Sequence, residues 1–401
     1  MDEVVAEHNT KTILAGAATA TLLLVGGQAM AKTRLKRYDT RYYILYTDVS
    51  ARAARQAAVR MNCMFREYYD RTRGWTTGQI TQKLPFYLFR HAADYYAAGG
   101  LPGSAGVFMG RRLMAIAGRH TTPWTWHVIQ HEGFHQFVYW KMQAHLPTWV
   151  NEGLAEYFGE AVFTGDGFVT GIIPPERLRR IKIEMRRRMF MSIHHIRRLS
   201  HGEWNSQLSG VNYDQAWSMV YFLAHADHHR FRRALGTYLR LLVEHVNRIH
   251  AWNVTFGNDD KDFQMRWRKY WLGLPPDPSR LKENQATCAT LTSFLARWRL
   301  LRKRFANAQA FFRYAAAHHI PAINDRLWLP QEMLKTALQQ ARTEGQWTLL
   351  HPKRRRPRLE LTDRGHDVWI GRFSLSGGAV RKVQVAFKKN PNAQAIRDGG
   401  Y

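Results

Sequence analysis

The segment His131-Glu132-Gly133-Phe134-His135 has the residue types and the spacing of a metal site. Two histidines four residues apart lie on one face of a helix, so both imidazoles can bind a single ion. Neutral imidazole nitrogen suits zinc, which keeps an open coordination position in catalytic sites. Glu132 lies on a different side of the same helix, where it can activate a water molecule without being a ligand. The motif therefore predicts metal-assisted hydrolysis.

A third ligand is expected shortly after the histidines. The segment Trp149–Phe158 contains Glu152 and Glu156, and sixteen residues separate His135 from Glu152. That length fits the end of one helix, a turn at Pro147 and the start of a second helix that returns Glu152 to the histidine face. Glu156 lies one turn further along the same face. It is either a rival ligand or an acceptor for a histidine N–H.

At these residues the sequence resembles a known family. The H-E-x-x-H followed by Trp149-Val150-Asn151-Glu152-Gly153-Leu154-Ala155-Glu156-Tyr157 is similar to the signature of the gluzincins, zinc metallopeptidases of the peptidase MA-like superfamily. The chain most resembles a poorly characterised bacterial branch of secreted peptidases. The resemblance covers roughly residues 40–275. It implies that Glu152 is the third zinc ligand and that the fold is thermolysin-like.

A second segment, Val211–Leu223, resembles the helix that follows the metal site in this branch. Related enzymes use a tyrosine or histidine in this region to hydrogen-bond the oxyanion of the tetrahedral intermediate. Tyr213, at the start of the segment, is the candidate for that role. The alternative is a tyrosine that only packs at a helix start. The resemblance thus implies Glu132 and Tyr213 as catalytic residues.

Local signals predict the elements that position these residues. Thr122-Pro123 is typical of a helix start, with threonine as the cap and proline in the first turn. Pro147 ends this helix near Ala144, and a second helix is expected from about Asn151. We expect an α+β fold, in which a small mixed sheet supports the active-site helices. The other predicted elements are strands at 41–47 and 86–89, a hairpin at 107–117, and helices at 50–71, 92–98, 175–190, 213–226 and 228–248.

The amino-terminal segment predicts export. An apolar run, Thr12–Gly27, precedes the small residues Ala29 and Ala31, which are typical of a signal-peptidase site. Residues 1–31 are therefore expected to be a signal peptide, or an anchor if they are not cleaved. The two cysteines, Cys63 and Cys288, form no Cys-x-x-Cys pair, which argues against a thiolate zinc site. They predict either one disulfide or two buried thiols.

Three further parts are expected after the leader. The zincin metallopeptidase domain takes residues 32–275 and ends at the proline-rich linker Pro275–Pro278. A helical region follows at 276–345, with helices expected at 291–317 and 331–344. Short alternating runs then predict a small basic β-rich unit at 346–401.

The chain is strongly basic, with a formal net charge of +28. Residues 1–175 contribute +5 and the remainder contributes +23. Such a charge attracts anionic cell-surface polymer or lipid headgroups. Nucleic acid is not expected as a partner, because no zinc finger, RRM signature or helix-turn-helix accompanies the charge. The basic tract Arg177–Arg188 is expected to be the solvated face of a helix beside the cleft.

Two functions follow from these observations. The first is a zinc-dependent peptidase in which Glu132 is the general base and the peptide substrate lies along the hairpin at 107–117. The alternative is a non-catalytic surface protein that binds anionic polymer through its basic C-terminal part. Zinc content distinguishes the two, since only the first requires the metal.

Overall fold

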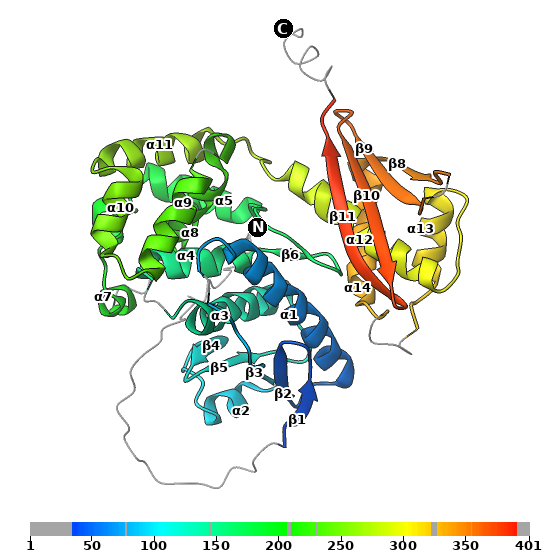
Figure 1. Ribbon diagram of the computed structural model, residues 1–401, viewed down its shortest axis with the longest axis horizontal. Helices are drawn as coiled ribbons and strands as arrows, with labels where there is room; N and C mark the ends of the chain where they lie inside the picture. Colours follow the sequence, from blue (N-terminus) through cyan, green and yellow to red (C-terminus); the bar gives the residue numbers. More distant parts are fainter. Residues whose placement is uncertain are drawn as a thin grey trace, which may run out of the picture. The chain divides into compact units, whose positions relative to one another are not determined.

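The computed structural model describes residues 34–76, 78–143, 146–206, 210–229, 231–321, 327–353 and 355–390. The expected α+β class is confirmed: these residues form fourteen helices and three small sheets (Figure 1). The expected leader lies outside the described residues. None of the helices in the described ranges combines the length and hydrophobicity needed to span a bilayer.

The described residues belong to two compact units. The first is drawn from Met1–Ser50, Thr72–Gly159 and Glu176–Leu274. The second is drawn from Ala51–Arg71, Glu160–Pro175 and Pro275–Tyr401. Two segments that precede Pro275 in the sequence therefore group with the C-terminal part. All the candidate site residues lie in the first unit.

The first unit contains a five-stranded mixed sheet in the order β1-β2-β3-β5-β4. Its inner strands β2, β3 and β5 run parallel, and the outer strands β1 and β4 pair antiparallel with their neighbours. Alternate residues of β2 and β3 are buried, as expected for strands with one face on a core. The strands span Lys36–Asp39 (β1), Tyr43–Thr47 (β2), Leu84–Phe89 (β3), Gly106–Met109 (β4) and Arg112–Ile116 (β5), and helix α2 spans Ala92–Ala97.

Helix α3, Pro123–Met142, packs on β4 and β5. It begins as predicted: the Thr122 side chain accepts a hydrogen bond from the amide of Thr125, and the two residues form a reciprocal capping box. It ends at Gln143, whose φ of 50° is left-handed, before Pro147 can clash with the helix. Most side chains of α3 between Trp126 and Val138 are buried, so the helix runs through the interior of the unit.

Helix α4, Thr148–Gly159, packs against both α3 and α8, Gly210–His229. Gly153 permits the close approach to α8, because a Cβ at this position would lie 2.5 Å from the carbonyl oxygen of Ala216. The last carbonyls of α4 would be unsatisfied inside the protein. Gln130 of α3 donates to the carbonyl oxygens of Phe158 and Gly159, both at 3.0 Å, and so fixes the two helices together.

Six further helices complete the first unit. Two of them, α9 and α11, pack on the buried α8, where Ser218 accepts a hydrogen bond from Trp267 at 3.2 Å. The helix expected at 175–190 ends at Arg186, and the one expected at 228–248 spans only 232–243. The six helices are α5 (Pro175–Arg186), α6 (Ile193–Ile196), α7 (His201–Ser206), α9 (Arg232–Val243), α10 (Arg248–Phe256) and α11 (Asp260–Gly273).

The second unit is built on a four-stranded antiparallel sheet in the order β11-β10-β9-β8, with α12 packed on β9, β10 and β11 (Figure 1). Cys63 and Cys288 are both buried free thiols in its core. The elements are α1 (Ala51–Thr72, whose last residue belongs to the first unit), β6 (Val162–Phe163), β7 (Phe168–Val169), α12 (Arg280–Leu300), α13 (Ala308–Ala317), α14 (Gln331–Glu344), β8 (Gly345–Leu350), β9 (Arg358–Asp363), β10 (Val368–Ser376) and β11 (Ala379–Lys388).

The single helix expected at 291–317 is wrong. The chain leaves α12 through Arg302, whose φ is 61°, and the amide of Lys303 bonds back to the carbonyl oxygen of Trp298 at 2.9 Å. Asn307 then caps α13 by accepting from the amide of Ala310 at 2.9 Å. No glycine or proline marks this break, so the helical periodicity of the sequence shows no sign of it.

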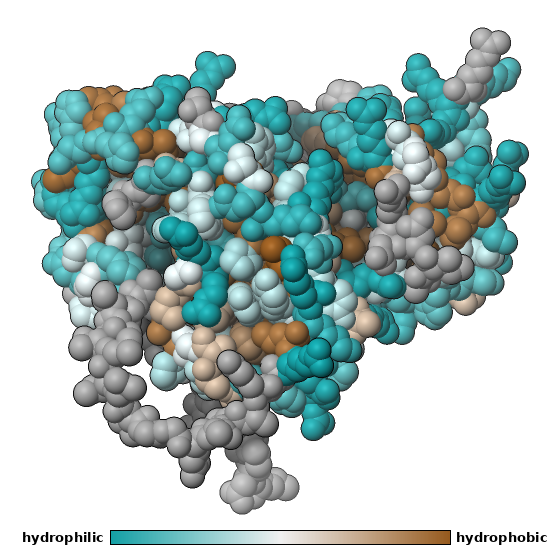
Figure 2. Space-filling model, turned by 60° about the horizontal axis from the view of Figure 1, so that its bottom comes forward, coloured by the Kyte–Doolittle hydropathy of each residue, from teal (hydrophilic) through white to brown (hydrophobic). Residues whose placement is uncertain are grey.

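Hydrophilic side chains cover much of the face that Figure 2 displays.

Candidate metal centre

Three side chains from α3 and α4 converge inside the first unit. The Nε2 atoms of His131 and His135 lie 3.1 Å apart. The Oε2 atom of Glu152 lies 3.3 Å from the first and 3.5 Å from the second. The structure therefore brings together the three residues that the sequence predicts as ligands.

These separations match a tetrahedral zinc site. Zinc binds imidazole nitrogen and carboxylate oxygen at about 2.0–2.1 Å, so neighbouring ligand atoms of a tetrahedron lie about 3.3–3.4 Å apart. All three observed distances are within a few tenths of an ångström of that value. Two imidazoles and one carboxylate also leave a fourth position open, as catalytic zinc sites do. The residues present thus fit zinc in number, type and spacing.

The electrostatics of the site favour a cation at its centre. Glu152 Oε2 is buried and accepts no hydrogen bond of normal geometry from the described residues. Burial alone would raise the pKa of Glu152, but His135 and His131 beside it lower that pKa to about 2. Burial would likewise lower the pKa of His131, but Glu152 and Glu156 raise it well above its ordinary value. The carboxylates therefore attract a positive charge, which a metal ion would supply.

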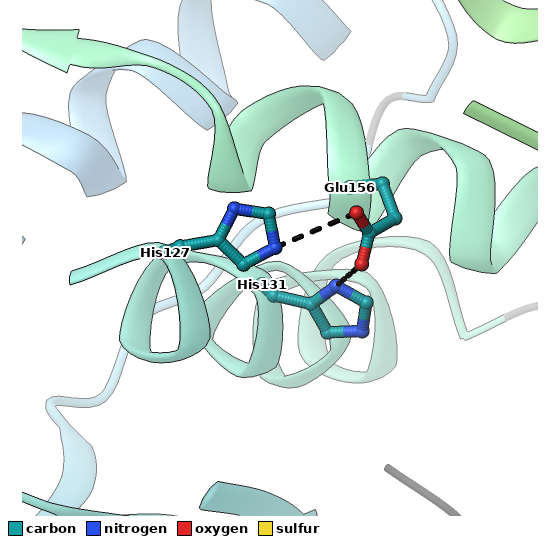
Figure 3. A group of neighbouring side chains, drawn as sticks. All are labelled: His127, His131 and Glu156. Atoms are coloured by element: carbon teal, nitrogen blue, oxygen red, sulfur yellow. Dashed lines mark ion pairs between the residues drawn. The ribbon is translucent and has the colours of Figure 1, made fainter. Parts of the chain in front are cut away.

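The other nitrogen of His131 faces Glu156. Its Nδ1 lies 3.0 Å from Glu156 Oε1, and His127 Nε2 lies 3.4 Å from Glu156 Oε2 (Figure 3). A proton on Nδ1 that points to this carboxylate leaves the Nε2 lone pair directed toward Glu152 and His135. Metal-binding histidines are commonly oriented by a carboxylate in this way. Glu156 therefore selects the tautomer of His131 that can bind a metal.

Arg177 of α5 neutralises Glu156. Its Nη1 lies 2.7 Å from Glu156 Oε2, and its Nε lies 2.9 Å from Asp214 Oδ1 at the start of α8. The guanidinium also stands over the ring of Trp217, 4.3 Å from its centroid. Burial would raise the pKa of Glu156, but Arg177 and His127 lower it well below its ordinary value. One buried arginine thus links α4, α5 and α8 behind the histidines.

A second group, His127, His131 and Glu156, also has the geometry to hold a metal. Its carboxylate is already paired with Arg177, so a metal bound there would lie close to a guanidinium and be repelled. Both groups need His131, through opposite ring nitrogens. The pairing with Arg177 therefore favours His131, His135 and Glu152 as the metal site and Glu156 as the carboxylate that orients His131.

Glu132 lies at β4, one of the two outer strands of the sheet. Its Oε2 accepts a hydrogen bond from the amide of Phe108 in β4 at 2.8 Å. This contact depends on the close packing of α3 on β4, where a Cβ on Gly106 would lie 2.5 Å from Cγ1 of Val128. The bond from Phe108 is the only hydrogen bond to the Glu132 carboxylate among the described residues, and it leaves Oε1 as the oxygen that can accept a water proton. The predicted base therefore follows His131 directly on α3 and contacts the edge strand β4.

Tyr213 also lies at the site. Its ring centroid is 6.4 Å from that of His131, and it makes an edge-to-face contact with Trp204 at 5.4 Å between centroids. Burial raises its pKa, and the charge of Glu152 adds to that effect. The hydroxyl therefore stays protonated at neutral pH, as a hydrogen-bond donor must.

Two residues behind the candidate ligands, Arg177 and Asp214, were not predicted from the sequence. Arg177 belongs to the tract expected to be solvated, yet its side chain is buried. A signal was present, because Arg177 shares a helix face with Ile181 and Met185, which are apolar and buried. No comparable signal marks Asp214, whose partners come from a helix more than thirty residues away.

One protein family matches part of the chain. It is described as a protein of unknown function (DUF1570), and the match covers residues 126–240. That range includes most of α3 and all of α4, α5 and α8, and therefore every residue of the candidate site except Phe108. No curated protein matches the chain.

Proposed function

We propose that the protein is a zinc-dependent peptidase of the gluzincin type, with His131, His135 and Glu152 as metal ligands. The observation that carries the proposal is the triangle of Nε2, Nε2 and Oε2 atoms with sides of 3.1, 3.3 and 3.5 Å. Its composition is that of a catalytic zinc site with one open position. The small mixed sheet followed by α3 and α4 agrees with a thermolysin-like catalytic domain.

The residues around the triangle supply what hydrolysis requires. Zinc, when bound, acts as a Lewis acid that polarises a peptide carbonyl and makes a water molecule more acidic. Glu132 takes the proton of that water on Oε1, while Phe108 N–H holds Oε2 in place. The same carboxyl then gives the proton to the leaving amine nitrogen. Tyr213 donates a hydrogen bond to the oxygen that becomes negative.

Strand β4 provides the surface for the substrate. It is one of the two outer strands of the sheet, and among the described residues no other strand pairs with its far side. An extended peptide can add to such an edge through main-chain hydrogen bonds, which do not depend on its sequence. The amide of Phe108 points away from β5, because it donates to Glu132. A peptide bound along β4 would therefore place one of its peptide groups beside the base.

Zinc content of single variants tests the assignment. The purified chain should hold one zinc, and His131→Ala and His135→Ala should lose it on dialysis against a weak chelator. His127→Ala is the matched control: it removes the same side chain one turn earlier on α3, outside the proposed ligand set, and should retain zinc. If the His135→Ala variant retained zinc and the His127→Ala variant lost it, the metal site would be the group that contains Glu156. Cleavage of a peptide library with and without chelator then tests the activity.

A further inference from the structure

Helix α5 has a second face that the metal site does not use. Its buried face holds Arg177, whereas Arg179, Ile183 and Arg186 lie on the opposite, exposed face. Arg187, Arg188 and Met189 continue this exposed surface beyond the helix end. Ile183 is 40% exposed and Met189 49% exposed. We call these residues (179, 183 and 186–189) the α5 surface.

The end of α5, like those of α3 and α12, has a side chain at a position that favours glycine. The amide of Met189 bonds to the carbonyl oxygen of Glu184 and that of Arg188 to Met185, which is a Schellman motif. Arg188 takes the left-handed position of the motif, with a φ of 56°. Glycine adopts this conformation freely, while other residues are strained in it. The chain thus has an arginine at a position where glycine would make the turn more stable.

The arginines of the α5 surface carry excess charge. Among the described residues, no ion pair neutralises Arg186, Arg187 or Arg188. Arg179 pairs with Glu176, so this pair adds no net charge. A basic residue near a helix C-terminus stabilises the helix dipole, but that effect falls off within the last turn and does not require three arginines. It also does not explain why Ile183 and Met189 are exposed among them.

We propose that the α5 surface binds the anionic headgroups of a lipid bilayer. Arginines attract phosphate-bearing headgroups and form paired hydrogen bonds with their oxygens. Ile183 and Met189 would enter the boundary between headgroups and acyl chains, as apolar residues of interfacial helices do. A soluble polyanion would use the arginines but would gain nothing from the two apolar side chains. The combination therefore favours lipid over anionic polymer or nucleic acid.

This surface is separate from the proposed catalytic residues. Arg177 holds Glu156 and Asp214 on the buried face of α5, and the lipid-binding residues lie on the other face. Substitutions on the exposed face should therefore leave zinc binding intact. The inference does not depend on the peptidase assignment, because its readout is binding to vesicles.

The test is sedimentation of the full chain with phosphatidylcholine vesicles, with or without phosphatidylglycerol. Pure phosphatidylcholine gives the charge-independent background, including any contribution from the apolar residues 12–27. The triple variant Arg186→Gln, Arg187→Gln, Arg188→Gly should bind anionic vesicles roughly 100-fold more weakly than the wild type. Arg188→Gly removes a charge and also relieves the left-handed strain, so the variant should fold. A second variant, Ile183→Ser with Met189→Ser, should bind roughly tenfold more weakly.

The matched control is Arg381→Gln, Lys382→Gln, Lys388→Gln, which removes the same charge from exposed positions of β11. It should change vesicle binding by less than about threefold. An equal loss in this control would show that only net charge matters and would overturn the proposal. Unchanged binding by the Ile183/Met189 variant, with soluble polyphosphate bound as tightly as vesicles, would assign the surface to polyanions instead.

Discussion

Arg177 Nη1 lies 2.7 Å from Glu156 Oε2, and both side chains are buried. The same guanidinium reaches Asp214 on α8, so one charge joins the helix that follows the histidines to the helix that carries Tyr213. The basic tract of the sequence thus contains a structural arginine as well as surface ones.

Replacing Arg177 by methionine should strongly destabilise the first unit. The change keeps a long apolar side chain but leaves Glu156 and Asp214 without their shared partner, and breaking a buried ion pair costs about 3–5 kcal/mol. Arg179→Met, on the exposed face of the same helix, should change the stability by less than about 1 kcal/mol. Urea unfolding of the zinc-free proteins measures both. Equal stabilities would mean that Arg177 is not held as the structure shows.

Glu152→Gln and Glu156→Gln should differ in their effect on zinc. The Glu156 variant loses the carboxylate that orients His131, and removing such a partner weakens metal affinity by roughly 10–100-fold. The Glu152 variant loses a ligand and should bind zinc more weakly still. Competition with a chromophoric chelator gives both affinities. The reverse order would identify Glu156 as the ligand.

Tyr213→Phe should lower kcat by roughly 100–1,000-fold with little change in KM, since the hydroxyl acts on charge that develops only in the transition state. Burial raises the pKa of Tyr213, and a tyrosine donates only while it is protonated. Ionisation of Tyr213 should therefore not lower the activity of the wild type between about pH 8 and pH 10. The wild type and the variant should show the same pH dependence over that range. An unchanged kcat would show that Tyr213 only packs against its neighbours and takes no part in catalysis.

Glu184 should make the stability of the protein depend on pH. Burial, followed by the charge of Asp214, raises its pKa to about 7. The folded protein therefore binds this proton more tightly than the unfolded chain, so stability is lost as pH rises from about 4.5 through about 7. Glu184→Gln should remove that dependence and be more stable than the wild type at pH 8 by roughly 1–2 kcal/mol. Urea unfolding at pH 5 and pH 8 compares them, and a stability difference that does not change with pH would contradict the argument.

Local signals were sufficient to predict the helices that carry the candidate ligands. The cap at Thr122, the i, i+4 histidines and the break at Pro147 act within a few residues of each other, and the structure confirms the helix that they define. The return of Glu152 to the histidine face could be predicted because only a short connection in the sequence separates the two helices. The catalytic consequences of this arrangement remain predictions.

The residues behind the ligands could not be predicted in the same way. Arg177 and Asp214 meet only because α5 and α8 pack together, and sequence periodicity does not show which buried charges will pair. The break after α12 was missed for a different reason. It depends on the left-handed Arg302, and an arginine gives no sign of that conformation.

Peptide hydrolysis by the Glu132→Gln variant tests the account most directly. The amide has the size of the carboxylate but cannot take a proton from water. With one zinc bound per chain in both proteins, the wild type should cleave a peptide library and the variant should be at least about 100-fold slower. Cleavage at the wild-type rate by the zinc-loaded variant would show that Glu132 is not the base. A zinc-loaded wild type that cleaves no peptide would contradict the proposed function itself.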